Sequence, residues 1–405
     1  MFPANESPAN AALRPAGLAL FLFAMPTLFA LAPTPTGLFG PLFALWWLAV
    51  NHRVVRPALG AAVVPSLVLA MSAWGLLGTL WAINAHVAAV DASLFLLECG
   101  PLTLFAAVCA GRPDLDRPAL TKALLGGIAV AVLLLAVQTR WGFLFRSWLA
   151  HAPAVDAGLK LNVPTAALAI LVWIAPALAL RLSAPWRLVT CVALGLMAYS
   201  VWAGIGSAPR LAFIVGASTW ACALVLPRLA LYGLGVAVAL IHFCAPFLGS
   251  SVWITQRVAD LSWRHRIDIW EYCGQLIAER PWLGYGFKNS DYVPGGHWLM
   301  PLTHQPADLP SYPHNVLLQI QLEQGLPGVL IFYVALAYLL CRLARSAAVP
   351  RAAGLALLAT GMSVWLVGYP LSRGHWVGWL CFAGIAWATT LSGGPTPVAN
   401  KVARA

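Results

Sequence analysis

Long apolar runs follow one another along almost the whole chain, and they decide what it can fold into. The runs are continuous rather than alternating, which favours helices over the strands of a barrel. Charged residues make up only 9% of the 405 residues, whereas soluble domains carry roughly 25%. We therefore predict an all-α polytopic membrane protein with about twelve transmembrane helices, at 16–32, 37–50, 59–81, 88–110, 123–138, 164–181, 188–204, 211–226, 229–247, 316–341, 352–369 and 375–393.

Basic residues between the runs predict the orientation of the chain. If the N-terminus is cytoplasmic, inside loops hold 14 of the 24 Lys and Arg residues, and outside loops other than 248–314 hold only 5. This bias follows the positive-inside rule and makes both termini cytoplasmic. We read 1–405 as one transmembrane domain that ends in a flexible cytoplasmic tail, 394–405. The net charge of +11 is then a sign of topology, and no nucleic-acid partner is expected.

Several common sites are missing from the sequence. The pattern Ala30-Leu31-Ala32 resembles a signal-peptidase site, but the long run and Pro33 favour a retained helix. The eight cysteines form no CxxC pattern and no Cys/His cluster, so neither a disulfide framework nor a zinc site is indicated. There is no GxxxxGK[ST], HExxH or GxSxG pattern, and nothing points to ATP or hydrolase chemistry.

The segment 248–314, on the outer side in this orientation, contains the first candidates for chemistry. An apolar stripe at helical spacing predicts an amphipathic helix here, formed by Trp263, Ile267, Trp270, Cys273 and Ile277. Arg264 lies off the stripe, one turn before Asp268, as a solvated partner of that carboxylate. Arg266 lies on the stripe, so its side chain is expected to point toward the membrane surface, where lipid phosphates are. There it can bind the phosphate of a specific ligand or, equally well, the headgroup of an ordinary lipid.

Four further residues on the same side are candidates. His314 precedes the tenth run and has the chemistry of a base or phosphate ligand, although a lone histidine is more often structural. Asn315 fits a helix cap. Glu323 is a carboxylate inside the membrane, suited to function or to holding a neighbouring helix. Arg210, in a tight outer turn, opposes the positive-inside trend, which indicates an anionic ligand or a phospholipid anchor.

The order of these motifs resembles the O-antigen ligase and O-antigen polymerase family. An arginine in a short turn is followed by Arg-x-x-x-Trp (266–270) and Pro-x-x-Gly-x-Gly (281–286), and then by His-Asn (314–315) and Glu-x-Gly-x-x-Gly (323–328). Helix number and the outer segment between the ninth and tenth helices also fit. Ala208-Pro209 before Arg210 departs from the plainer Ser-Arg of the family, which weakens that one correspondence.

This resemblance implies a GT-C-like glycosyltransferase of the bacterial inner membrane, with its active site facing the periplasm. The ligase transfers O-antigen from undecaprenyl diphosphate to the lipid A-core oligosaccharide. His314 would be the catalytic base or would hold the diphosphate, and Arg210 and Arg266 would bind the diphosphate. Secondary candidates are Arg264, Asn315, Glu323 and Trp270. Neither metal, cofactor nor ATP is expected, and direct displacement would invert the anomeric centre.

Two other functions remain open at this point. An O-antigen polymerase would use the same donor with a lipid-linked acceptor, and residue types do not separate it from a ligase. A transporter or flippase would need charged residues paired across several helices, or repeats with broken helices. Only Glu98 and Glu323 lie well inside the predicted spans, which favours the enzyme.

Overall fold

The structure is helical throughout its described part. The computed structural model describes residues 8–52, 55, 62–112, 115–141, 161–258, 260–293, 312–371 and 374–392. Within these ranges it contains α-helices and short 3₁₀ turns and no strand. The predicted tail 394–405 lies outside the described residues, as does part of the outer segment, 294–311.

Every predicted apolar run coincides with a helix or a short chain of helices. These are α1 (Pro8–Leu31), α2 (Pro33–Val50), α4 (Val63–Leu77), α5 (Ala85–Ala110), α6 (Arg117–Arg140), α9 (Asn162–Leu171), α10 (Ala175–Ala179), α11 (Ala184–Ala203), α12 (Ser207–Val225), α13 (Pro227–Cys244), α16 (Val316–Ala344), α17 (Ala348–Trp365) and α18 (Gly374–Thr390). Eight of the described spans are long and apolar enough to cross a membrane. The chain is therefore a multi-pass membrane protein, while the number twelve stays a prediction.

The run predicted at 164–181 is the most deeply buried part of the bundle. Here α9 passes through the 3₁₀ turn η2 (Val172–Ile174) into α10. Pro176 explains the tighter turn, because its ring clashes with the carbonyl four residues earlier. Residues 166–172 are completely buried, and α9 contacts α1, α6, α11, α12, α17 and α18. A helix that is apolar on all sides suits this central position.

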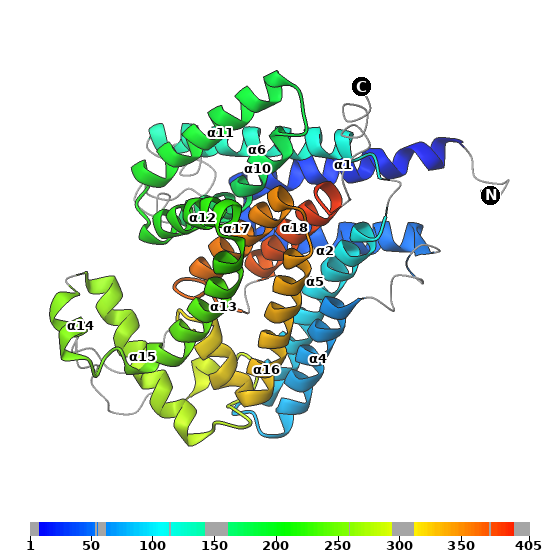
Figure 1. Ribbon diagram of the computed structural model, residues 1–405. Coiled ribbons are helices and arrows are strands. Elements are labelled where there is room, and N and C mark those ends of the chain that lie inside the picture. Colours follow the sequence, from blue (N-terminus) through cyan, green and yellow to red (C-terminus); the bar gives the residue numbers. More distant parts are fainter. Residues whose placement is uncertain are drawn as a thin grey trace.

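Helices α14 (Val252–Arg257) and α15 (Leu261–Glu279) project from one end of the bundle, beside the start of α16 (Figure 1). We call this the outer end; it is periplasmic in the predicted orientation. The Asp260 side chain caps α15 by accepting from the Trp263 backbone N–H at 3.0 Å. The predicted stripe is the packing face, since Ile267, Trp270 and Cys273 are buried. This face packs on α16 and on the 3₁₀ turn η3 (Ala245–Phe247).

Candidate functional site

The segment after α15 crosses the first turns of α16, and hydrogen bonds at the crossing hold the segment and the helix together. The Tyr285 N–H donates to the Leu322 carbonyl at 2.9 Å, and the Gly286 N–H donates to the Glu323 carbonyl at 2.8 Å. Gly325 interrupts the helix with φ +63°, and a Cβ there would lie 2.2 Å from the Trp282 carbonyl oxygen. Only glycine allows this crossing. The two glycine motifs thus contact each other: Pro-x-x-Gly-x-Gly lies on the crossing segment and Glu-x-Gly-x-x-Gly lies on α16.

Glu323 lies under this crossing and is completely buried. Its carboxylate accepts from the Ser290 hydroxyl at 2.6 Å, the Lys288 N–H at 2.8 Å and Gln319 Nε2 at 3.0 Å. The Gln319 side-chain oxygen in turn accepts from the Leu371 N–H at 2.9 Å. Glu323 therefore ties the outer segment to α16 and, through Gln319, to the connection after α17. This geometry supports a structural role more than contact with substrate.

Replacing Glu323 by glutamine should destabilise the protein. The glutamine amide would direct its own N–H group at one of the donors whose hydrogen bond the carboxylate now accepts. That donor would then be buried without an acceptor, which costs about 1–3 kcal/mol. We expect a lower thermal unfolding midpoint in detergent. Asp291→Asn is the matched control on the same segment, because its ion pair with Lys288 is partly exposed and should contribute less than about 1 kcal/mol. An equal midpoint for Glu323→Gln and wild type would contradict this role.

Trp270 connects α15 to the residues before α16. Its ring is buried, and its Nε1–H donates to the Pro313 carbonyl at 3.0 Å. Asn315 follows two residues later and caps α16, as expected: its side-chain oxygen accepts from the Leu317 and Leu318 N–H groups at 3.0 and 3.3 Å. His314 is held between these two attachments. Trp270 and Asn315 therefore hold the backbone on either side of His314.

Trp270→Phe should slow catalysis without abolishing folding. Phenylalanine keeps most of the packing but loses the hydrogen bond to Pro313, so His314 would be held less accurately. Misplacing a reacting group costs up to about 100-fold in rate, and we expect a fall in kcat with little change in KM. Trp282→Phe is the control, because that ring on the same segment is 69% exposed. Equal kcat values for the two variants would refute the positioning role.

Arg266 turns toward the connection between α17 and α18. Its Nε–H donates to the Val367 carbonyl at 2.9 Å. One terminal nitrogen, Nη1, donates to the Ser262 carbonyl at 2.9 Å and to the Ser262 hydroxyl. The guanidinium lies 5.5 Å from the centre of the Trp263 ring. All of these partners are neutral, so the cation is fixed in place and its charge is not neutralised by them.

The remaining terminal nitrogen of Arg266, Nη2, makes no hydrogen bond within the described residues, and no carboxylate there comes within ion-pair distance. Burial lowers the pKa of the guanidinium, an effect that Tyr312 and Asp260 partly offset; at neutral pH the group stays charged. A half-buried, oriented arginine with unused donors suits a phosphate or diphosphate, which it contacts with paired N–H groups.

His314 has an unusual backbone conformation. Its φ of +56° is in the left-handed region, which is uncommon outside glycine and is found at functional sites. Its Nδ1 lies 3.3 Å from the Gly368 carbonyl oxygen, and its ring centre lies 4.4 Å from that of Tyr312. A carbonyl only accepts, so Nδ1 carries the proton and Nε2 is the atom that can act as a base.

Arg266 and His314 thus converge on neighbouring carbonyls, those of Val367 and Gly368. The sequence predicted a span at 352–369, but α17 ends at Trp365, so these carbonyls are free of the helix ladder. The apolar run 352–369 gave no sign of this loop. The Gly368-Tyr369-Pro370 sequence, which breaks helices, was the available signal.

Within the described part of the chain, Arg210 makes no hydrogen bond that links it to Arg266 or His314. Its guanidinium donates to the Val201, Trp202 and Gly204 carbonyls at 3.3, 3.2 and 2.8 Å. It therefore caps the end of α11, where carbonyls lack helical partners. The adjacent Ala208 and Leu211 pack on the large apolar cluster that also contains Val367. A role for Arg210 in binding diphosphate stays a prediction.

Arg264 also has a local partner. Its Nε–H donates to the Val258 carbonyl at 2.6 Å, which fixes the chain before α15. Arg264 was expected to be a solvated partner of Asp268, but Asp268 is completely buried. The stripe was correct but too narrow: the face of α15 that packs on the bundle also includes Asp268, Ile269 and Tyr272.

Part of the chain matches a known family. Residues 192–333, from within α11 to within α16, match the model described as O-Antigen ligase. The matched stretch contains Arg210, Arg266, His314 and Glu323.

Curated relatives come from Rickettsia species and carry the name "Putative polysaccharide ligase". The Rickettsia conorii protein is 27% identical over 275 residues, which are 64% of this chain and 63% of the relative. The Rickettsia bellii protein is 28% identical over 282 residues, 65% of this chain and 64% of the relative. A shorter match of 71 residues, 17% of each chain, is 41% identical to the Rickettsia prowazekii protein. The similarity thus spans less than two thirds of these relatives' length.

Proposed function

We propose that this chain, whose residues 192–333 match the model described as O-Antigen ligase, transfers a polysaccharide from a lipid diphosphate to a lipid-anchored acceptor. The observation that carries the proposal is the convergence of two side chains on the Val367–Gly368 backbone: Arg266, whose hydrogen-bond partners in the described residues are neutral, and His314, whose Nδ1 faces a carbonyl. The arginine suits a departing diphosphate, and the histidine suits an attacking hydroxyl. The names of the rickettsial relatives, polysaccharide ligases, agree with this chemistry.

The donor we propose is O-antigen linked to undecaprenyl diphosphate, and the acceptor is a hydroxyl of the lipid A-core oligosaccharide. Both are membrane-anchored, and the outer end of a multi-pass bundle is where their polar parts would meet. In the predicted orientation this end faces the periplasm of the bacterial inner membrane. The compartment supplies no ATP, and the donor needs none because its sugar–diphosphate bond is already activated.

The reaction follows from the two side chains. The acceptor hydroxyl oxygen forms a bond to the anomeric carbon of the donor sugar. The bond from that carbon to the diphosphate oxygen breaks, and the diphosphate leaves with the electron pair. The hydroxyl proton passes to Nε2 of His314, whose Nδ1–H stays directed at Gly368. Arg266 neutralises the charge that grows on the leaving diphosphate. Attack from the opposite side inverts the anomeric centre.

With an arginine in this role, transfer should not require a divalent metal. We expect the rate of purified protein to be unchanged within about twofold after treatment with EDTA, since the stabilisation of the leaving group comes from fixed side-chain charge. Adding Mg²⁺ or Mn²⁺ after EDTA should give no increase. A chelator-induced loss that a metal restores would show that the diphosphate depends on a cation.

The function is tested in a bacterial strain that lacks its own O-antigen ligase. Expression of this chain should restore a ladder of O-antigen on lipid A-core in a lipopolysaccharide gel. The absence of a ladder from well-expressed protein would contradict the ligase function. The same chain would then be tested in a strain lacking O-antigen polymerase, where a restored ladder would identify the alternative acceptor.

A further inference from the structure

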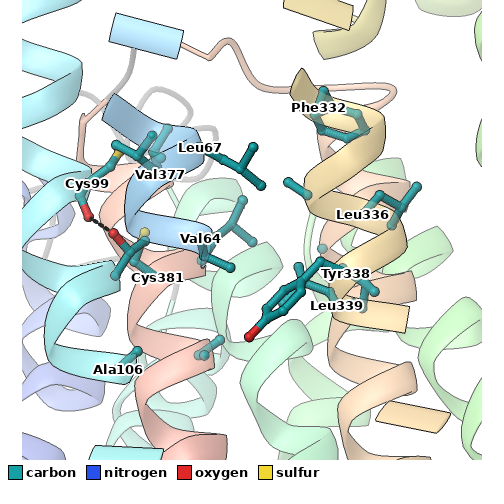
Figure 2. Close-up of a pocket in the computed structure, with 18 of the residues that line it drawn as sticks. Val64, Leu67, Cys99, Ala106, Phe332, Leu336, Tyr338, Leu339, Val377 and Cys381 are labelled. Atoms are coloured by element: carbon teal, nitrogen blue, oxygen red, sulfur yellow. Dashed lines mark hydrogen bonds between the residues drawn. The ribbon is translucent and has the colours of Figure 1, made fainter. Parts of the chain in front are cut away.

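A long apolar cavity lies within the membrane-spanning bundle, and its lining includes Trp365 and Leu371, on either side of the Val367–Gly368 backbone. It has a volume of about 400 Å³ and is lined by α4, α5, α16, α17 and α18. Figure 2 shows Val64 and Leu67 of α4 on one side, across from Leu336 and Leu339 of α16 on the other. Protein interiors rarely leave voids of this size, and inside a membrane an apolar cavity of this size is suited to hydrocarbon.

On α4 and α16 the lining lies mainly in the half of the membrane away from the outer end, while Trp365 and Leu371 extend it toward that end on α17 and the loop after it. Nearer the outer end, α4 and α16 are joined, because Trp74 Nε1–H donates to the Gln324 carbonyl at 2.9 Å. On α16 the lining includes Ile320 and then a stretch from Ile331 to Leu343, and this stretch is about 18 Å of helix at 1.5 Å per residue. That is about the hydrocarbon depth of one leaflet, half of the ~30 Å core. The length fits one fatty acyl chain.

The end of the cavity opposite the outer end is polar. Arg342 lines it, is exposed, and within the described residues makes no side-chain hydrogen bond or ion pair. Tyr338, about one helical turn before Arg342, also lines the cavity (Figure 2). An arginine at the headgroup level above an apolar channel matches a lipid with a phosphate at the surface and a chain below it.

We propose that this cavity binds an anionic glycerophospholipid of the leaflet at the Arg342 end, which is the cytoplasmic leaflet in the predicted orientation. Its phosphate contacts Arg342, and one acyl chain fills the space between α4 and α16. The lipid completes the packing of the bundle at the point where these two helices separate. This site is independent of the proposed transfer reaction.

The structure offers a substitution that closes the cavity. Gly384 lines it on α18, and a Cβ added there would meet no atom within 4 Å. Leucine at this position would occupy the space of the acyl chain without a backbone collision, and it is a good helix former. Gly195 on α11 is the matched control, because a Cβ there also meets nothing within 4 Å and it lies outside the cavity.

The test is native mass spectrometry of the full chain purified in mild detergent, followed by exchange into phosphatidylcholine with and without phosphatidylglycerol. Wild type should retain one anionic phospholipid. Gly384→Leu should lose it and Gly195→Leu should keep it. Arg342→Gln should lower the preference for phosphatidylglycerol about fivefold, the effect of one basic residue near the surface. The neighbouring Arg345→Gln should not.

Three results would overturn the proposal. One is wild-type protein without bound phospholipid. Another is equal retention in the Gly384→Leu and Gly195→Leu variants. The third is a polyisoprenyl diphosphate recovered in place of the phospholipid, which would assign the cavity to the tail of a donor. Because Arg342→Gln changes an exposed side chain, it reports on the site even if Gly384→Leu folds poorly.

Discussion

His314→Gly should reduce the rate of polysaccharide transfer about 100-fold to 10,000-fold, the range for removing a general base. Glycine is the appropriate replacement because His314 has a φ of +56°, which glycine adopts without cost. Alanine would keep the backbone penalty of about 1–2 kcal/mol that His314 itself carries at this φ, but would lose the ring contacts with Gly368 and Tyr312 that accompany it. The thermal unfolding midpoint of His314→Gly should therefore stay close to that of wild type. The rate is measured with purified protein and labelled donor.

His86 provides the control for this variant. It is an exposed histidine at the start of α5, at the outer end of the bundle like His314, so His86→Ala should leave the rate unchanged. Donor binding by His314→Gly should also persist, because Arg266 is attached to Val367 and Ser262 rather than to the histidine. A His314→Gly protein with wild-type rate would remove the histidine from the mechanism.

Arg266→Gln should lower the rate about 100-fold to 1,000-fold, as is typical when a fixed group that stabilises transition-state charge is lost. Lysine should restore little of this activity, since its point charge cannot donate to Val367, Ser262 and a phosphate with the planar geometry of a guanidinium. The main effect should be on kcat if Arg266 stabilises the departing diphosphate, with a smaller rise in KM for the donor.

Arg264→Gln is the matched control on the same helix. Arg264 carries the same charge two residues earlier, but its Nε–H donates to the Val258 carbonyl. We expect a loss of less than about tenfold, arising from a looser start of α15. If Arg264→Gln and Arg266→Gln reduced the rate equally, general positive charge rather than a placed guanidinium would be responsible.

The bundle and the outer helix were predictable because they follow from side-chain patterns. Continuous apolar runs indicated the helices, and the stripe from Trp263 to Ile277 indicated the packing face of α15, where Trp270 and Cys273 are indeed buried. The end of α15 at Glu279 follows from Pro281 and the glycines behind it. In each case a local rule and the tertiary packing favour the same conformation.

The surroundings of the candidate residues were not predictable, because they consist largely of backbone groups. The carbonyls of Val367 and Gly368 have no side-chain signature, and Leu366 and Val367 extend the apolar run past the true end of α17. The position of Arg210 indicated an anionic ligand or a phospholipid anchor, whereas the structure shows that its guanidinium donates to three carbonyls at the end of α11. Sequence spacing identifies a cation on the outer side but not the acceptors that hold it.

The central claim is tested most directly by reconstituting transfer with purified protein. The assay contains polysaccharide linked to undecaprenyl diphosphate, lipid A-core acceptor and either wild type or His314→Gly, and it measures product and released lipid diphosphate. We predict equal amounts of product and released diphosphate, dependent on acceptor with wild type and nearly absent with His314→Gly. Equal transfer by both proteins, or elongation of the lipid-linked polysaccharide without product on lipid A-core, would contradict the account.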